Sequence, residues 1–217
     1  MENDTFVSTQ PDNDTCTISI DSHKVFQLPQ LTHSDMYLSR KLGCYNFGIH
    51  LSDNGEGIIW LAPCVLHAVN DNHLTYKQNL RIWSDNCCGQ IKNRIMLFLY
   101  IFSNCYRIGH EFIMVGHSFS ASDRDSALIE KRGKVSRHQA LEDVESVITN
   151  ARPTKPFKVL KMRGHFLYFD EAASRTINTN RLHISKLVSL IIDSENPVVV
   201  KFKRSYSELE DFTTCNV

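Results

Sequence analysis

The chain has 217 residues, of which 42% are hydrophobic and 22% are charged, and these values exclude general disorder. Its 24 Lys and Arg residues balance its 24 Asp and Glu residues, so the total charge gives no support for nucleic-acid binding. Seven cysteines without a Cys-x-x-Cys pair fit neither a zinc finger nor a disulfide framework. The longest apolar run, Ile95–Phe102, is too short to cross a bilayer. We expect an intracellular protein with no membrane partner, and the nucleus is a compatible location.

The N-terminal half predicts a β-meander. Residues 1–15 are polar, and we expect them to be disordered. Alternating or β-branched runs predict strands at 17–21, 45–50 and 58–61. Asp21 would be the last residue of the first strand. A short helix could follow in 62–72.

The middle of the chain alternates strands with helices. A buried strand is expected at 80–84 and a second at 112–115, and helices are expected at 90–107, 123–134 and 139–150. Ser120 or Ser122 could cap the helix that begins at Asp123. The remaining pattern predicts strands at 157–161, 166–169, 187–192 and 198–203, and the last ten residues are expected to fray.

These elements predict an α/β fold in which helices pack against the faces of a mixed sheet. We divide the chain into a core of residues 16–150 and a β-rich C-terminal extension of residues 151–206. The two ends, 1–15 and 207–217, are expected to be disordered.

Charge is unevenly distributed along the chain. Residues 1–80 carry four basic and nine acidic side chains, whereas residues 152–204 carry eleven basic and four acidic ones. The basic segment could form a phosphate-facing surface, with Lys158, Lys161, Lys201 and Lys203 as candidates. It could equally be an ordinary solvated face.

Three carboxylates stand at ends of predicted elements: Asp21, Asp85 after the buried strand, and Asp123 at a helix start. The first and fourth strands of such a sheet can lie side by side, which would make Asp21 and Asp85 neighbours. Grouped carboxylates raise each other's pKa unless a cation neutralises them. Mg²⁺ or Mn²⁺ prefers such oxygen ligands, and a pair of these ions can clamp a phosphodiester.

Each acid also has a structural interpretation, which position alone leaves open. Asp21 could be an ordinary strand-end residue. Asp85 and Asn86 could cap a helix starting at Gly89 or Gln90. The acids at 123 and 125 could stabilise a helix N-terminus through its dipole.

Two segments carry a family resemblance: Asp85-Asn-Cys-Cys-Gly-Gln-Ile-Lys-Asn93 and Gly116-His-Ser-Phe-Ser-Ala-Ser-Asp123. They resemble motifs of transposase-like domains of unknown function that are common in animal genomes. That family belongs to the RNase H-like superfamily, with the DDE transposases and retroviral integrases. The resemblance covers roughly residues 17–206. It implies an RNase H-like mixed sheet with the element order β-β-β-α-β-α-β-α.

The resemblance implies a site as well. Asp21, Asp85 and Asp123 match the three acids of a DDE site, which would bind Mg²⁺ or Mn²⁺ and act on DNA. Asp123 fits better than Asp125 because it lies six residues after His117, and residues two apart on a helix point about 200° apart. A reserve metal ligand, Glu130, lies seven residues further along the same helix face.

The chain departs from the family at Ile91, where Asn is usual, and at Ser126, where Phe is common. The stretch 60–72 is also shorter than the family's first crossover. Three outcomes therefore stay open. The chain could be a phosphodiester-cleaving or strand-transfer enzyme, a domesticated non-catalytic module that binds nucleic acid or protein, or a remnant without function.

Overall fold

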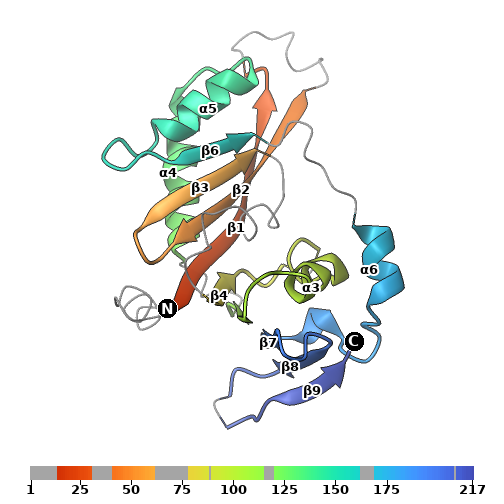
Figure 1. The fold of residues 1–217 in the computed structure, drawn as a ribbon. Helices are drawn as coiled ribbons and strands as arrows, with labels where there is room; N and C mark the ends of the chain where they lie inside the picture. Colours follow the sequence, from red (N-terminus) through yellow and green to blue (C-terminus); the bar gives the residue numbers. More distant parts are fainter. Residues whose placement is uncertain are drawn as a thin grey trace.

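The computed structural model describes residues 14–30, 41–61, 78–87, 89–114, 120–161, 169–207 and 209–217. These residues form a mixed sheet with the strand order β6-β3-β2-β1-β4-β5-β7-β8-β9 (Figure 1). Its strands are β1 (Thr15–Leu28), β2 (Leu42–Leu51), β3 (Glu56–Leu61), β4 (Asn79–Ser84), β5 (Arg107–Phe112), β6 (Lys158–Lys161), β7 (Ser189–Asp193), β8 (Val199–Lys203) and β9 (Thr213–Asn216). The helices are α3 (Arg94–Ile101), α4 (Ala121–Val135), α5 (Leu141–Thr149) and α6 (Asp170–Thr176), with a 3-10 turn at Ile184–Lys186. The predicted α/β class is confirmed.

Strand β1 joins two kinds of pairing. It is antiparallel to β2 on one side and parallel to β4 on the other. Strands β4 and β5 are also parallel, and the C-terminal strands extend both ends of this sheet, β6 beside β3 and β7 beside β5. The expected adjacency of the first strand and the strand predicted at 80–84, which is β4, is therefore confirmed.

Two apolar cores lie on opposite faces of the sheet. Along β3, Ile58 and Trp60 belong to the core that contains α3, whereas Ile59 and Leu61 belong to the core beneath α4 and α5. Figure 1 shows α4 and α5 over the β1–β3 and β6 half, and α3 with α6 beside the other half. Burial on both faces explains why β3 reads as an unbroken apolar run.

A β-bulge interrupts β1. The register pairs His23 with Asn46 but then Phe26 with Cys44, so β1 contains one extra residue there. Before the bulge, Ile18 faces the core of α3; after it, Phe26, an even number of residues further on, faces the core of α4 and α5. A one-residue insertion changes which side chains point to a given face, because side chains alternate along a strand.

Two predicted elements in the middle of the chain are wrong in extent. The helix expected at 90–107 is only α3, whose N-cap Asn93 accepts a hydrogen bond from the Met96 amide at 2.9 Å. The strand expected at 112–115 is β5, which begins at Arg107. Apolar residues at helical spacing continue past the end of α3, so the sequence pattern predicted a longer helix and not the strand β5, whose residues alternate between buried and more exposed positions.

Other differences lie toward the C-terminus. The tail expected to fray contains β9, which pairs with β8, and α6 was not predicted at all. The strand expected at 166–169 ends on Phe169, which precedes α6 as its N-cap; residues 166–168 and the helix expected at 62–72 lie outside the described residues. In the described ranges, no helix has the length and apolar character needed to cross a membrane.

Candidate functional site

Asp21 lies at the point where β4 stops. The parallel pairing of β1 with β4 ends at Ile20 and Ser84, so Asp21 and Asp85 are the next residues of the two strands. Asp21 was predicted to be the last residue of β1, but this is wrong, because β1 continues beside β2 to Leu28. The expected neighbourhood of the two acids thus follows from the end of β4 and not from the end of β1.

The surroundings of Asp21 favour its protonated form. Burial is the main cause, followed by the negative charges of Asp123 and Asp85, and together they raise its pKa from 3.8 to about 6. A hydrogen bond from the Ser22 amide opposes this shift. Among the described residues, no cation pairs with Asp21. The structure therefore brings Asp123 and Asp85 close enough for their charges to act on Asp21.

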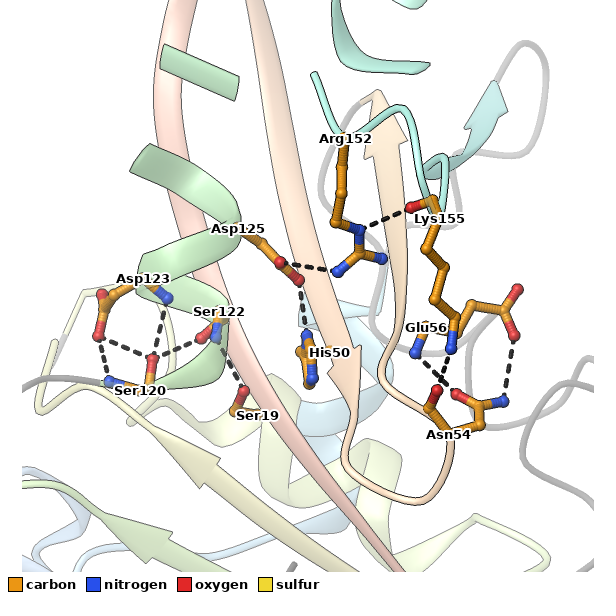
Figure 2. A network of polar contacts seen from close by, with 10 residues as sticks. All are labelled: Ser19, His50, Asn54, Glu56, Ser120, Ser122, Asp123, Asp125, Arg152 and Lys155. Atoms are coloured by element: carbon orange, nitrogen blue, oxygen red, sulfur yellow. Dashed lines mark hydrogen bonds and ion pairs between the residues drawn. The ribbon is translucent and has the colours of Figure 1, made fainter. Parts of the chain in front are cut away.

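Helix α4 is fixed over β1 by its first turn. The Ser122 amide donates to Ser19 Oγ at 3.1 Å, and Ser19 lies two residues before Asp21 on the same side of β1 (Figure 2). Ser120 caps the helix, as one of the two predicted candidates: its Oγ accepts from the Asp123 amide, and Asp123 Oδ2 accepts from the Ser120 amide at 2.7 Å. Asp123 therefore takes part in a capping box and also lies near Asp21.

A chain of buried hydrogen bonds supports the elbow at Asp85. Ser84 Oγ donates to the Asp85 carbonyl at 2.9 Å, so it accepts from His110 Nε2 at 2.8 Å. Burial lowers the pKa of His110 to about 3, so the imidazole is neutral, and its Nδ1 accepts from the Tyr100 hydroxyl at 2.9 Å. The Asp85 carboxylate accepts from the Cys87 amide at 3.3 Å.

The predicted cap role of Asp85 and Asn86 is wrong, because the next helix begins at Arg94 and is capped by Asn93. Glu130 is also placed differently from the expectation. Its carboxylate pairs with Lys24 at 3.0 Å and Lys134 at 3.3 Å, and it is not among the charges that act on Asp21. The hypothesis about His117 lies outside the described residues.

Asp125 forms a second charged group, which the sequence did not reveal. Asp125 is buried, and its carboxylate pairs with His50 Nδ1 at 2.7 Å and Arg152 at 3.2 Å (Figure 2). Arg152 Nε donates to the Lys155 carbonyl at 2.6 Å, and Lys155 contacts the Asn54 carbonyl. These bonds join α4, the β2–β3 hairpin and the connection from α5 to β6. Asp123 and Asp125 thus have separate partners, as their helical spacing implies.

The three acids have ligand atoms that suit a metal ion, but their arrangement does not form a closed metal site. Carboxylate oxygens are the ligands that Mg²⁺ and Mn²⁺ prefer. Within the described ranges, however, no group of three or more His, Cys, Asp or Glu side chains is arranged to hold a metal. Asp123 also directs Oδ2 to Ser120. The side chains supply suitable ligands but not a closed metal site.

The four lysines expected to share one phosphate-facing surface do not lie together. Lys158 and Lys161 are on β6, at one edge of the sheet, whereas Lys201 and Lys203 are on β8, near the other. Seven strand spacings separate β6 from β8, which corresponds to roughly 30 Å. Lys161 pairs with Glu145, and Lys201 pairs with Asp193. The sequence could not show this, because sheet order separates segments of similar charge.

Comparisons of the chain with protein-family models, curated proteins and solved structures found no match.

Proposed function

We propose that the chain is an RNase H-like domain of the transposase-like kind, whose ancestral activity is divalent-metal-dependent cleavage or strand transfer of DNA phosphodiesters. The observation that carries the proposal is the raised pKa of Asp21, caused in part by Asp123 and Asp85 at the end of β4. Three antiparallel strands, β1–β3, followed by parallel β4 and β5 support the fold. The corresponding location is intracellular, with action on DNA in the nucleus.

Each acid has a defined part in this proposal. Asp21 and Asp85 lie on adjacent strands and would hold the cation, and Asp123 would complete the ligands from the first turn of α4. Bound Mg²⁺ or Mn²⁺ would supply the positive charge that this cluster lacks. The hydrogen-bonded chain from Tyr100 to the Asp85 carbonyl would keep the elbow in place.

The decisive experiment measures nicking of supercoiled DNA by the purified protein with Mg²⁺ or Mn²⁺. We expect Asp85→Asn to reduce nicking to background, whereas Asp211→Asn, an exposed carboxylate on the tail, leaves it unchanged. Nicking that is equal in the wild type and Asp85→Asn would contradict the role of Asp85.

Metal binding gives an independent readout. A cation bound only to the folded state stabilises it by about 2.7 kcal/mol at 100 times its Kd. Mg²⁺ or Mn²⁺ should therefore raise the Tm of the wild type and of Asp211→Asn, but not that of Asp85→Asn.

One observation favours the second candidate, a non-catalytic DNA-binding module. Asp123 is occupied in a capping box, and the described residues contain no closed metal site. DNA binding without nicking, and with no metal-dependent change in Tm, would favour this function over the first.

A further inference from the structure

In the part of the chain that the structure describes, no helix lies over one face of β4, β5, β7 and β8. The even-numbered side chains of these strands, such as Ile82, Ile108 and Val200, belong to the core that contains α3. The odd-numbered side chains point to the opposite face, and of these only Ser189 is buried. Figure 1 shows α4 and α5 over the other half of the sheet. We call the odd-numbered positions of these four strands the open face.

A hollow of about 320 Å³ lies in the middle of the open face. Gly109 forms part of it, between Arg81 of β4 and Ile191 of β7. A Cβ on Gly109 would meet nothing within 4 Å, so the missing side chain leaves space above the strand. A glycine inside a strand often marks the close approach of a ligand. Arg107 and Glu111, which flank Gly109 on the same face of β5, place hydrogen-bond donors and an acceptor beside this space.

The open face has a net positive charge. It contains two more cations than acids: Arg81, Arg107, Lys201 and Lys203 against Glu111 and Asp193. Arg107 and Lys201 share one carboxylate, that of Asp193, at 3.2 and 2.8 Å. Among the described residues, no acid pairs with Lys203, whose Nζ lies 4.8 Å from the centre of the Phe212 ring. The excess positive charge favours an anionic partner, and its spread over several strands suits a polymer.

Two exposed aromatic side chains border the open face. Phe212 directly precedes β9 and is 40% exposed, although Lys203 lies over its ring. Tyr206 is 43% exposed, and burial together with the negative charge of Glu111 raises its pKa, so its hydroxyl lies near this face. Aromatic side chains stack on bases of any sequence. Cations and exposed aromatic rings on one surface are typical of proteins that bind single strands of nucleic acid.

We propose that the open face binds a single strand of nucleic acid, with one base in the hollow at Gly109, another stacked on Phe212 and the phosphates at the lysines of β8. The bases of a single strand are free to enter the hollow and to stack on a ring, whereas those of a duplex are stacked on one another. An acidic peptide would match the charge but has no series of flat groups for the hollow and the ring.

Binding to the open face needs neither the three acids nor a metal ion, and only its link to cleavage rests on the proposed function. Trp83, the open-face residue at the end of β4, comes two residues before Asp85. A strand bound along this face could therefore continue to the acids. Single-stranded DNA and RNA carry the same phosphates and similar bases, so the experiment compares the two.

The test is fluorescence anisotropy of the full chain in EDTA with a labelled mixed-sequence single strand, as DNA and as RNA, and with the DNA duplex. Phe212→Leu should weaken single-strand binding at least about fivefold, because a base–aromatic stack is lost. Its control is Tyr45→Leu, which removes an aromatic side chain that is 62% exposed on β2, in the other half of the sheet.

Two further variants test the phosphate contact and the hollow. Lys203→Gln should lower the slope of log affinity against log salt concentration by about 0.7, the value for one phosphate contact of a single strand. Lys131→Gln, at an exposed lysine of α4, should leave the slope unchanged. Gly109→Leu should fill the hollow and weaken binding by about as much as Phe212→Leu does, and thermal unfolding shows whether this variant folds.

Binding of a single strand that is tighter than that of the duplex, and that Phe212→Leu weakens but Tyr45→Leu does not, supports the proposal; the tighter of the DNA and RNA forms is then the preferred strand. The proposal is overturned if no single strand binds at about 100 μM, the weak end of ordinary non-specific affinity. Duplex binding of equal strength, displacement of the strand by polyglutamate at equal charge, or equal binding by Phe212→Leu and Tyr45→Leu would also overturn it. If Gly109→Leu does not fold, the two aromatic variants still decide.

Failure of this proposal can be distinguished from failure of the proposed function. Asp85→Asn should bind the single strand normally in EDTA, because Asp85 lies beyond the end of β4 and is not part of the open face. Binding that requires Phe212, in a protein without metal-dependent nicking, would preserve the open face and reject the enzyme. Nicking that requires Asp85, with equal binding by Phe212→Leu and Tyr45→Leu, would do the reverse.

Discussion

Asp21 and Asp85 are the first residues beyond the Ile20–Ser84 pair, with which the parallel pairing of β1 and β4 ends. Asp21 is still within β1 and is held by β2, whereas Asp85 begins an elbow that buried hydrogen bonds support. One acid is therefore fixed by the sheet and the other by the turn. Asp123, from α4, adds a third charge to the same region, and the predictions below test these relationships and the packing around them.

Replacing Asp21 should stabilise the protein at high pH. Its folded pKa of about 6 lies above the ordinary 3.8, so the folded state holds this proton more tightly than the unfolded state. Wild-type stability should fall relative to that of Asp21→Asn as pH rises from about 4 to about 6, and the difference should then stay constant. The shift corresponds to about 3 kcal/mol at most, and solvent screening reduces it to roughly 1–2 kcal/mol.

Urea unfolding between pH 3.5 and 8, without divalent ions, measures this difference. Asp211→Asn, in the exposed tail, should follow the wild type at every pH. A stability of Asp21→Asn below that of the wild type at pH 8 would show that the fold favours the ionised carboxylate.

Removing Asp125 should strongly destabilise the fold. Asp125→Ala leaves His50 and Arg152 without their shared carboxylate in a largely buried place, and breaking such a group typically costs about 3–5 kcal/mol. Asp170→Ala removes an exposed acid that lies 3.5 Å from Arg94, and it should cost less than about 1 kcal/mol. Chemical denaturation of both variants makes the comparison, and equal losses would show that the Asp125 group is not a stabilising one.

A methyl group at Gly48 should disturb the bulged strand. A Cβ there would lie 2.3 Å from His23 Nε2, so the buried imidazole must move. We expect Gly48→Ala to cost about 1–3 kcal/mol, as overpacking does. Gly109→Ala is the matched control, because it also lies in a strand but its Cβ would meet nothing within 4 Å. Thermal unfolding gives both values, and a combined Gly48→Ala and His23→Ala variant should recover part of the loss.

The hydrogen-bonded chain behind the elbow can be tested with a pair of Tyr→Phe changes. Tyr100→Phe leaves His110 Nδ1 buried without its donor, which should cost about 1–3 kcal/mol. Tyr106 is 47% exposed and donates to Glu195, so Tyr106→Phe should change stability by less than about 0.5 kcal/mol. Urea midpoints of the two variants are compared. Similar values would mean that water or another group replaces the lost hydroxyl.

Local patterns were sufficient for many elements. The apolar run at 58–61, the strand at 80–84 and the two helices after Ser120 all correspond to observed elements, because each was defined by burial or a cap within a few residues. The boundary between α3 and β5 was missed, because apolar residues at helical spacing continue past Ile101, the last residue of α3, to Phe102, Cys105 and Tyr106. Edge strand β9 was missed because its stability comes from pairing with β8 and not from its own composition.

The sequence by itself determined the α/β class, the position of Asp85 after a strand and that of Asp123 in the first turn of a helix, because these features depend on neighbours in the chain. Only the tertiary structure decided which charges meet. The register of β1 against β4 sets Asp21 beside Asp85. Glu130 forms ion pairs with Lys24 and Lys134 instead of joining these two acids. Strand order divided the four candidate lysines between β6 and β8, and the bulge in β1 changed which of its side chains face each core. Charges act through space, and pairing between distant segments fixes those distances.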